Sequence, residues 1–224
     1  MSAPPSVERK PALSSVERCL SEIRRMILSG ELLPGEKVHQ SDLADRLDVS
    51  RIPLREALST LQAEGVLTHR LNSGYQVARF SGGDLGQLYL MRRLLETELL
   101  RTATLTPAVA ETMESLNEQL KLIDRNEELH RYLQVNEAFH FVPFETSPLR
   151  LVRADVARLW YRTGFYRSMY ILEANAAERV FAEHGQMIEA ARDGDIERLI
   201  ALSDQHRAGT QMLLTKRLSR PPVH

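Results

Sequence analysis

The chain contains 224 residues, of which 43% are hydrophobic and 26% are charged. These proportions are typical of a globular protein with a substantial core, and the length fits one large domain or two modest ones. The formal net charge of −1 argues against an architectural DNA protein, because such proteins bind through many cationic contacts with phosphate.

The chain carries no signal for export or for a membrane. No apolar run approaches the ~18 residues that a membrane-spanning helix needs, and the start, MSAPPSVERKPALSS, lacks the apolar segment of a secretory signal. The single cysteine, Cys19, excludes an internal disulfide and fits a reducing compartment. Its apolar neighbours predict a core position. We therefore expect a cytoplasmic protein without a membrane partner.

The first 80 residues predict a small mixed domain. Residues 1–12 contain three prolines and predict a flexible arm. Three helices are predicted next, over residues 16–27, 41–47 and 51–64, with Ser50 as the N-cap of the third. Two strand-like runs then follow, over residues 66–71 and 75–80, around an Asn72-Ser73-Gly74 turn that predicts a β-hairpin.

After Ser81-Gly82-Gly83 the pattern is helical to the end of the chain and fits about six helices. The predicted breaks fall near Thr106-Pro107, Asn126, Ser147-Pro148, Asn175 and Asp193-Gly194-Asp195. The sequence thus predicts a mainly α protein. A winged helix-turn-helix of three helices and a β-hairpin occupies residues 13–80, an all-α helical-bundle effector domain occupies residues 81–218, and residues 219–224 form a tail.

The segment SDLADRLDVSRIPLREALSTLQAEGVL carries the chemistry of the first domain. In a winged helix-turn-helix the second helix of the motif enters the major groove with its first turn leading. Arginine suits guanine edges and phosphate, and a helix N-terminus favours anions. The predicted DNA-binding residues are Ser50, Arg51, Pro53, Arg55, Arg70, Asn72, Ser73 and Gly74. The alternative is that the two helix arginines are merely solvated.

A longer pattern surrounds these residues: Pro34-Gly35, Leu43-Ala44, VSRIPLREAL over residues 49–58, and LQAEG ending at Gly65. With Gly74 and Val77 in the wing, it resembles the DNA-binding domain of the GntR family of bacterial regulators over about residues 14–79. The resemblance implies a transcriptional regulator that binds DNA. Several relatives have a basic residue at the position of Ser41, so the resemblance implies a weaker phosphate contact there.

In the helical region, the stretch VNEAFH places Asn136 and His140 four residues apart, on one face of a helix. An oxygen and an imidazole at that spacing can chelate a divalent ion, or they can edge a core. His184 and His206 fall on the inward faces of two later helical patterns. A lone histidine on an apolar face is usually a hydrogen-bonded core residue, and that alternative stays open.

The helical region resembles the FCD effector-binding domain of the FadR branch, and its six helices suggest the VanR-like subgroup. Metal-binding members use an Asp-x-x-x-His helix and two later histidines. The resemblance therefore implies a metal site of Asn136, His140, His184 and His206, with Zn²⁺ expected and Ni²⁺ or Mn²⁺ as alternatives. Because Asn136 replaces a carboxylate with a neutral oxygen, the ion would attract an anionic ligand more strongly.

We therefore expect a homodimer that binds palindromic operator DNA, acts as a repressor by analogy with the family, and responds to a small carboxylate. Arg92 could clamp that carboxylate, or pair with Glu96 at i,i+4. The aromatic residues within 160–166 could line the pocket or fill the core.

Two further functions remain open at this stage. In a metal-sensing regulator the ion itself is the signal. In a metal-dependent enzyme the three histidines would activate water. The sequence offers no nearby acid or base with a defined role for that enzyme, because the adjacent Glu137 points about 100° away from Asn136 on the same helix.

Overall fold

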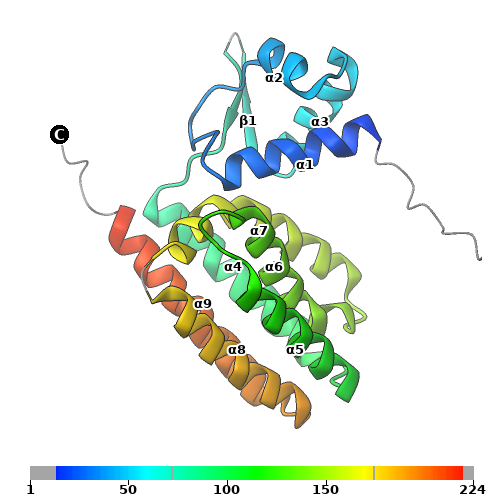
Figure 1. Ribbon diagram of the computed structural model, residues 1–224, viewed down its shortest axis with the longest axis vertical. Coiled ribbons are helices and arrows are strands. Elements are labelled where there is room, and N and C mark those ends of the chain that lie inside the picture. The colour runs from blue at the N-terminus through cyan, green and yellow to red at the C-terminus, as the bar shows by residue number, and fades with distance from the viewer. Residues whose placement is uncertain (1–13, 72, 174, 219–224) are drawn as a thin grey trace, which may run out of the picture.

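The computed structural model describes residues 14–71, 73–173 and 175–218, and it consists of a small head next to a helical bundle (Figure 1). The predicted arm over residues 1–12 and the tail over residues 219–224 lie outside the described residues. The head contains α1 (Ser15–Leu28), α2 (Gln40–Leu47), α3 (Arg51–Ala63), β1 (Leu67–Arg70) and β2 (Gly74–Val77). The bundle contains α4 (Gly82–Arg101), α5 (Pro107–Leu122), α6 (Leu129–Glu145), α7 (Arg150–Ile171), α8 (Ala176–Arg192) and α9 (Ile196–Leu218). This is the mainly α architecture that the sequence predicts.

The tight turn between α2 and α3 shapes the helix-turn-helix. Asp48 closes α2 in the left-handed conformation, with φ 51° and ψ 53°, and redirects the chain toward α3. Ser50 occupies the predicted N-cap position with extended backbone, but its hydroxyl makes no capping hydrogen bond. Pro53 lies in the first turn of α3, where its missing N–H is tolerated. The capping bond expected of Ser50 is therefore absent, and its exposed hydroxyl is not engaged at the helix end.

The strands differ from the predicted ones: β1 is one residue shorter at each end, and β2 begins one residue earlier and ends three residues earlier. β1 and β2 pair antiparallel from Leu67 opposite Val77 to Arg70 opposite Gly74. Before β1, the amide of Val66 donates to the carbonyl of Leu61 at the end of α3. After β2, the amide of Phe80 donates to the hydroxyl of Tyr166 on α7, at 2.9 Å. These bonds anchor the hairpin to α3 on one side and to the bundle on the other.

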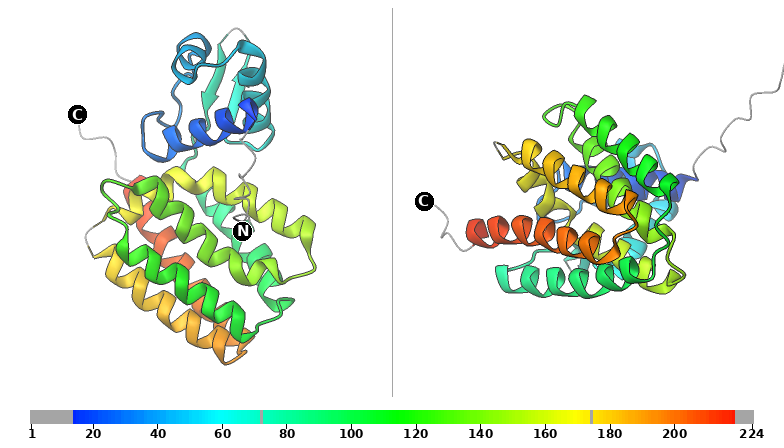
Figure 2. Two further views of the ribbon diagram at one scale, coloured as in Figure 1. Left: turned by 45° about the vertical axis from the view of Figure 1, so that its right-hand side comes forward. Right: turned by 90° about the horizontal axis from the view of Figure 1, so that it is seen from below.

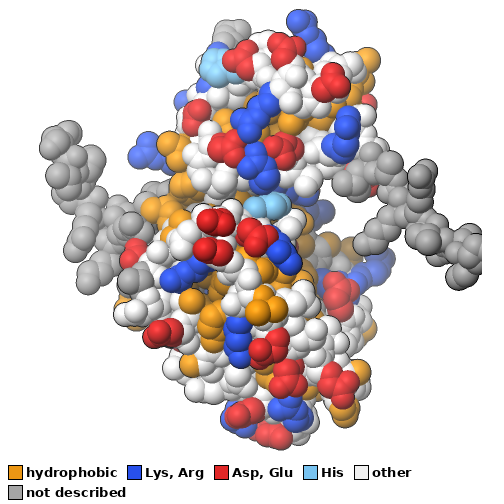
Figure 3. Space-filling view, viewed as in Figure 1, with side chains coloured by type: hydrophobic (Ala, Val, Ile, Leu, Met, Phe, Trp, Pro, Cys, Tyr) orange, Lys and Arg blue, Asp and Glu red, His pale blue; other side chains and the backbone are white. Residues whose placement is uncertain are grey.

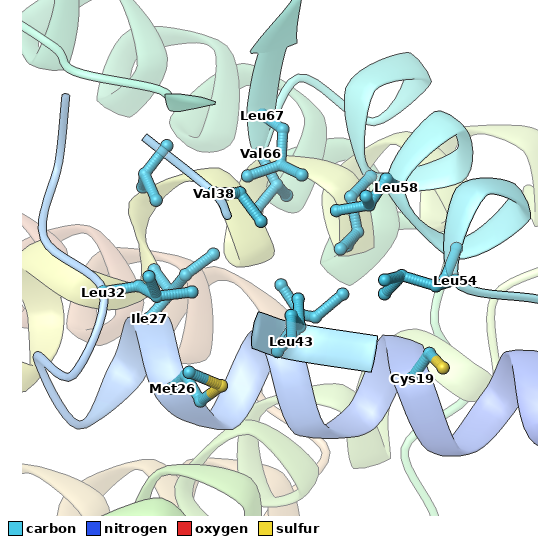
Figure 4. Close-up of a cluster of buried hydrophobic side chains, with 14 of the residues drawn as sticks. Cys19, Met26, Ile27, Leu32, Val38, Leu43, Leu54, Leu58, Val66 and Leu67 are labelled. Atoms are coloured by element: carbon cyan, nitrogen blue, oxygen red, sulfur yellow. The ribbon is translucent and has the colours of Figure 1, made fainter. Parts of the chain in front are cut away.

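One hydrophobic core holds the head together (Figure 4). Cys19 and Ile23 on α1, like Leu58 on α3, are fully buried, and Leu43 on α2 is 5% exposed. Val38, in the connection before α2, is 2% exposed. The core position predicted for Cys19 is confirmed. Because burying one such side chain contributes about 1.5–3 kcal/mol, this shared core fixes α3 relative to α1 and the hairpin.

The bundle helices pack around a second core. α4 packs against α9 and α7, while α5 packs against α6 and α8 (Figures 1 and 2). A capping box of Ser81 and Asp84 begins α4. The helix ends fall at the predicted breaks, because proline, asparagine and glycine-containing turns separate the helices there. None of the described helices is both long enough and apolar enough to span a bilayer.

The head contacts the bundle through α1, which lies against α6 and α7 (Figure 1). At Gly164 on α7 the two parts lie close together, because an added Cβ would lie 2.7 Å from Cδ2 of Leu28 on α1. Glycine at this position lets the two helices meet. On the face in Figure 3, acidic and basic side chains are interspersed over both parts, as the net charge of −1 implies.

Candidate DNA-binding surface and metal site

The first turns of α3 present two arginines to solvent. Arg51 and Arg55 are both exposed, and within the described residues neither guanidinium pairs with a carboxylate. Together with Ser41, His69 and Tyr75 they border one surface hollow between α2, α3 and the hairpin. Positive side chains that protein carboxylates leave unpaired are available to phosphate and base edges.

The other predicted DNA-binding residues lie around this hollow or at the hairpin turn. Ser50 is exposed and Pro53 is half-buried. Arg70 is exposed at the end of β1, opposite Gly74, and Ser73 belongs to the turn between them. Asn72 lies outside the described residues. The Ser41 hydroxyl donates to the carboxylate of Asp42 at 3.0 Å.

Three histidines from three helices converge inside the bundle. His140 on α6, His184 on α8 and His206 on α9 place their candidate ligand nitrogens within 4.8 Å of one another. His184 is fully buried and His140 is 8% exposed. The distances between their ring centroids are 5.0 to 5.2 Å. The fold therefore brings together the three residues that helical periodicity places on separate inward faces and that the family resemblance groups in one site.

Hydrogen bonds orient two of the three rings. His184 Nδ1 donates to Asn117 Oδ1 on α5 at 3.1 Å, and the ring of Phe139 stacks on His184 at 3.9 Å. His206 Nδ1 donates to the carboxylate of Glu183 at 2.5 Å. Because amide and carboxylate oxygens accept these bonds, the Nε2 lone pairs of both rings remain available to a metal. The Nε2 of His184 is buried without a partner.

Asn136 completes the candidate donor set. It is 5% exposed, its Oδ1 is buried without a partner, and it lines the same cavity as His140 and His206. Burial, followed by the neighbouring histidines, holds the pKa of His140 and of His184 well below the ordinary value. Their rings are therefore neutral at physiological pH, which is the form that binds a cation. Three imidazole nitrogens and an orphaned amide oxygen fit a divalent transition metal.

An ionic network forms another wall of this cavity. Arg92 Nε donates to Glu96 Oε1 at 2.7 Å, and Arg207 Nε donates to Glu96 Oε2 at 3.0 Å. Trp160 Nε1 donates to Glu96 Oε1 at 2.8 Å. The i,i+4 ion pair that the sequence offered for Arg92 is therefore present. Arg92 also lines the cavity, so the pairing does not remove it from the site.

Arg167 is a cavity residue that the sequence did not indicate. It is 7% exposed, and its Nε and Nη1 are buried without partners. Its Nη2 lies 3.7 Å from Glu137 Oε2. Burial lowers the pKa of Arg167 to about 10, so it stays charged at neutral pH. Glu137 faces this arginine, and it does not line the cavity that His140 lines.

The aromatic residues within 160–166 do not all line the histidine cavity. Among the described residues that line the histidine cavity, Trp160 is the one that comes from this range. Its ring lies under the guanidinium carbons of Arg92 and Arg167, at 4.2 and 4.0 Å. Tyr161 instead lies under Arg24 of the head, at 4.1 Å. Phe165 packs against the hydrophobic cores.

A winged helix-turn-helix joined to a helical bundle, with a cavity lined by candidate metal ligands, is the arrangement expected of a DNA-binding transcriptional regulator. Residues 16–77 match the family model described as "Bacterial regulatory proteins, gntR family". Residues 87–209 match the model of the FCD domain. The chain therefore belongs to the GntR family, in the FadR-like branch that carries an FCD domain, as its motifs predict.

Curated relatives and solved structures agree with this assignment. The chain is 26% identical over 176 residues to the HTH-type transcriptional regulator YdhC of Bacillus subtilis, which covers 77% of this chain and 78% of the relative. It is 36% identical over 118 residues to the Nta operon transcriptional regulator of Aminobacter aminovorans, covering 52% and 56% of the two chains. The structure of E. coli McbR/YncC matches with a TM-score of 0.80 at 20% identity, over 92% of this chain and 99% of that one. These relatives are transcriptional regulators, and the chain is a regulator and not an enzyme.

Proposed function

We propose that the chain is a homodimeric repressor in the cytoplasm that binds palindromic operator DNA. A small carboxylate, bound beside a metal ion in the bundle, would release it. The observation that carries this proposal is the convergence of three histidine nitrogens within 4.8 Å, two of them on rings that are oriented by hydrogen bonds. Preorganised ligands of this kind are typical of metal sites.

In this proposal each head reads one half-site. Arg51 and Arg55 contact phosphates or base edges from the first turns of α3, supported by the hydroxyl of Ser50 and by Pro53. The hairpin turn, with Arg70, Asn72, Ser73 and Gly74, approaches the neighbouring groove. Two-fold symmetry of the protein would then match two-fold symmetry of the operator.

His140, His184 and His206 hold the ion, with Asn136 as a weaker fourth ligand. Zn²⁺ is the expected ion, with Ni²⁺ or Mn²⁺ as alternatives. The ion supplies positive charge for a carboxylate oxygen, because this donor set leaves the charge near +2 uncompensated. Arg92 and Arg167 line the same cavity and suit the other end of an anionic effector.

We assign the interface of the proposed dimer to three exposed apolar side chains on α4. Leu90, Met91 and Leu94 are 48%, 40% and 52% exposed on this one helix. Large apolar side chains grouped on a surface mark interaction sites more often than scattered ones do. Effector binding in each bundle would change the relative placement of the two heads, and thus the affinity for both half-sites.

Metal analysis tests the site. Purified protein is expected to contain about one divalent ion per subunit, and the triple variant His140→Ala, His184→Ala, His206→Ala is expected to contain none. His39→Ala, which changes an exposed histidine of the head, is the matched control and should keep the ion. Protein that stays metal-free after reconstitution would refute the metal site.

DNA retardation tests the regulator. DNA from upstream of the gene should be retarded, and unlabelled upstream DNA should compete while random DNA does not. A carboxylate found by a thermal-shift screen should lower the retarded fraction. Equal competition by random DNA would contradict operator recognition, and retardation that survives every bound carboxylate would contradict the effector role.

The neutral donor set favours one alternative, a metal-sensing regulator. The described cluster contains no carboxylate ligand, because Glu183 bonds to His206 instead. Neutral ligands bind a cation less tightly, so occupancy could follow the supply of metal. In that case removal of the ion with EDTA would change operator retention without any carboxylate, and addition of Zn²⁺ would restore it.

A further inference from the structure

A second cavity lies between the head and the bundle. Its volume is about 370 Å³, within the range of small-molecule sites. Leu20, Ile27 and Leu28 on α1 form its apolar side, and α6 and α7 form the opposite wall. Cavities at domain interfaces are frequent ligand sites because both domains contribute contacts.

This interdomain cavity is distinct from the histidine cavity. Its described lining contains none of the four candidate metal ligands. The two cavities share one wall, which consists of Leu133, Trp160 and Arg167. A molecule in the interdomain cavity would therefore contact that wall from the side opposite the histidines.

Several buried nitrogens in the wall of the interdomain cavity have no hydrogen-bond partner. Among the described lining residues, the buried polar atoms without a partner are all nitrogens: Arg24 Nε, His130 Nδ1, and Arg167 Nε and Nη1. The arginine nitrogens are N–H donors, which are normally paired when buried, so unpaired ones at a cavity indicate a missing acceptor. His130 Nδ1 adds a further donor in the tautomer that carries the proton on this nitrogen. The Arg167 nitrogens lie on the shared wall, but Arg24 and His130 belong to this cavity alone.

The acidic residues of the lining are already engaged. The carboxylate of Glu17 accepts from the amide of Ser14, at 2.8 Å, at the start of α1. Glu137 faces Arg167 at 3.7 Å. Arg24 binds Glu64 through Nη2, at 2.7 and 2.8 Å, while its Nε remains unpaired. Neither carboxylate accepts from Arg24 Nε or His130 Nδ1, so both nitrogens remain open to a bound molecule.

We propose that the interdomain cavity binds a second small molecule, one with an apolar body of one or two rings and a single carboxylate. The apolar body packs against Leu20, Ile27 and Tyr161, and the carboxylate accepts from Arg24 and His130. This site goes beyond the proposed function, because it needs neither the metal nor any of the four candidate metal ligands. Its occupant bridges α1 to α6 and α7, and so fixes the head against the bundle.

Calorimetry on the full chain with 1-naphthoate as the probe tests the site. We expect saturable binding with a Kd below about 1 mM. The neutral isostere 1-naphthamide should bind at least about tenfold more weakly, because it lacks the charge that strengthens hydrogen bonds from arginine. Equal binding of acid and amide would refute the carboxylate class.

Substitutions then locate the probe. Ser21→Trp fills the cavity from its exposed rim on α1 and should abolish binding. Ser15→Trp places the same side chain on the same helix away from the lining and should leave binding unchanged. Gln134→Trp fills the cavity from α6 and repeats the test without altering the head. His140→Ala changes the other cavity and should leave binding intact.

Two results would overturn the proposal. One is the absence of saturable naphthoate binding to the wild type. The other is binding that survives both Ser21→Trp and Gln134→Trp but is lost in His140→Ala, since the probe would then occupy the histidine cavity. Neither result bears on operator retardation or on metal content, so this proposal and the proposed function can fail separately.

Discussion

In the head, Glu31 meets Arg25 and Arg46 at the surface, where the three side chains are 35%, 30% and 49% exposed. In the bundle, Glu96 is held between Arg92 and Arg207, with side chains that are only 4 to 5% exposed. Exposed pairs contribute about 0–1 kcal/mol, whereas breaking a buried pair costs about 3–5 kcal/mol.

This difference separates two uses of charge in one chain. The described ion pairs of the head have side chains that are 19 to 49% exposed, and its two α3 arginines have no carboxylate partner among the described residues. Charge in the head is therefore available for binding and matters little for stability. The bundle uses charge inside its core, so the same substitution there should disturb the fold. Each of the following variants tests one side of that contrast.

The largest effect is expected in the bundle. Glu96→Gln leaves Arg92 and Arg207 without their shared counter-charge, and we expect a loss of about 3–5 kcal/mol in the free energy of unfolding. Urea unfolding measures it. Glu98→Gln, which removes an exposed carboxylate from the same helix, should cost about 0.5 kcal/mol or less. Similar losses in the two variants would contradict the contrast between buried and exposed charge.

The second-largest effect is expected for the two exposed arginines of α3. Arg51→Ala and Arg55→Ala should each weaken operator binding by about 1–3 kcal/mol, because a contact with phosphate or base is lost. The unfolding free energy should stay within about 0.5 kcal/mol of the wild type. Arg18→Ala, an exposed arginine on α1 away from the hollow, serves as control. Retardation titrations at fixed salt decide the matter, and unchanged affinity in both variants would remove α3 from the interface.

A smaller change is expected at the metal site. Asn136→Asp adds a negative charge to a neutral donor set and should tighten metal binding about tenfold, or about 1.4 kcal/mol. The same charge should weaken the carboxylate effector. Competition with a chromophoric chelator measures the metal, and calorimetry measures the effector. Asn126→Asp, an exposed change between α5 and α6, controls for net charge, and equal metal affinities for the two variants would exclude Asn136 as a ligand.

The smallest effect is in the pH dependence of the head. Hydrogen bonds from Arg25 and then Arg46 lower the pKa of Glu31 from 4.5 to about 2. Its contribution is therefore present above pH 4.5 and is lost as the pH falls through the folded pKa. Because Glu31 is partly exposed, we expect about 0.5–1 kcal/mol after screening. The difference in urea stability between wild type and Glu31→Gln should disappear between pH 4.5 and 2, and a constant difference would contradict this account.

The sequence predicts most of the head because its signals are local. The Pro34-Gly35 turn, the Ser50 cap position and the glycine after α3 each act within a few residues. The turn falls between α1 and α2, and the other two mark the start and the end of α3. The second strand was predicted to extend to Phe80, but it ends at Val77. The amide of Phe80 instead donates to the hydroxyl of Tyr166, which lies 86 residues further along the chain. A local pattern contains no information about such a partner.

The same limit applies to the candidate site. Helical periodicity places the histidines on inward faces, and the i,i+4 spacing offers Glu96 as a partner of Arg92. It cannot indicate Asn117, which reaches His184 from 67 residues away, or Glu183, which pairs with His206 from 23 residues away. Arg167 has no distinguishing pattern, since its importance comes from burial without a full set of partners.

Trp160 is the only tryptophan in the chain, and it stands in the wall between the two cavities. Its indole N–H is bonded to Glu96 and two guanidinium groups lie over its ring. Indole emission depends on neighbouring charge and on contact with water. The emission wavelength and intensity of Trp160 fluorescence should therefore change when a ligand fills either cavity, without any added label.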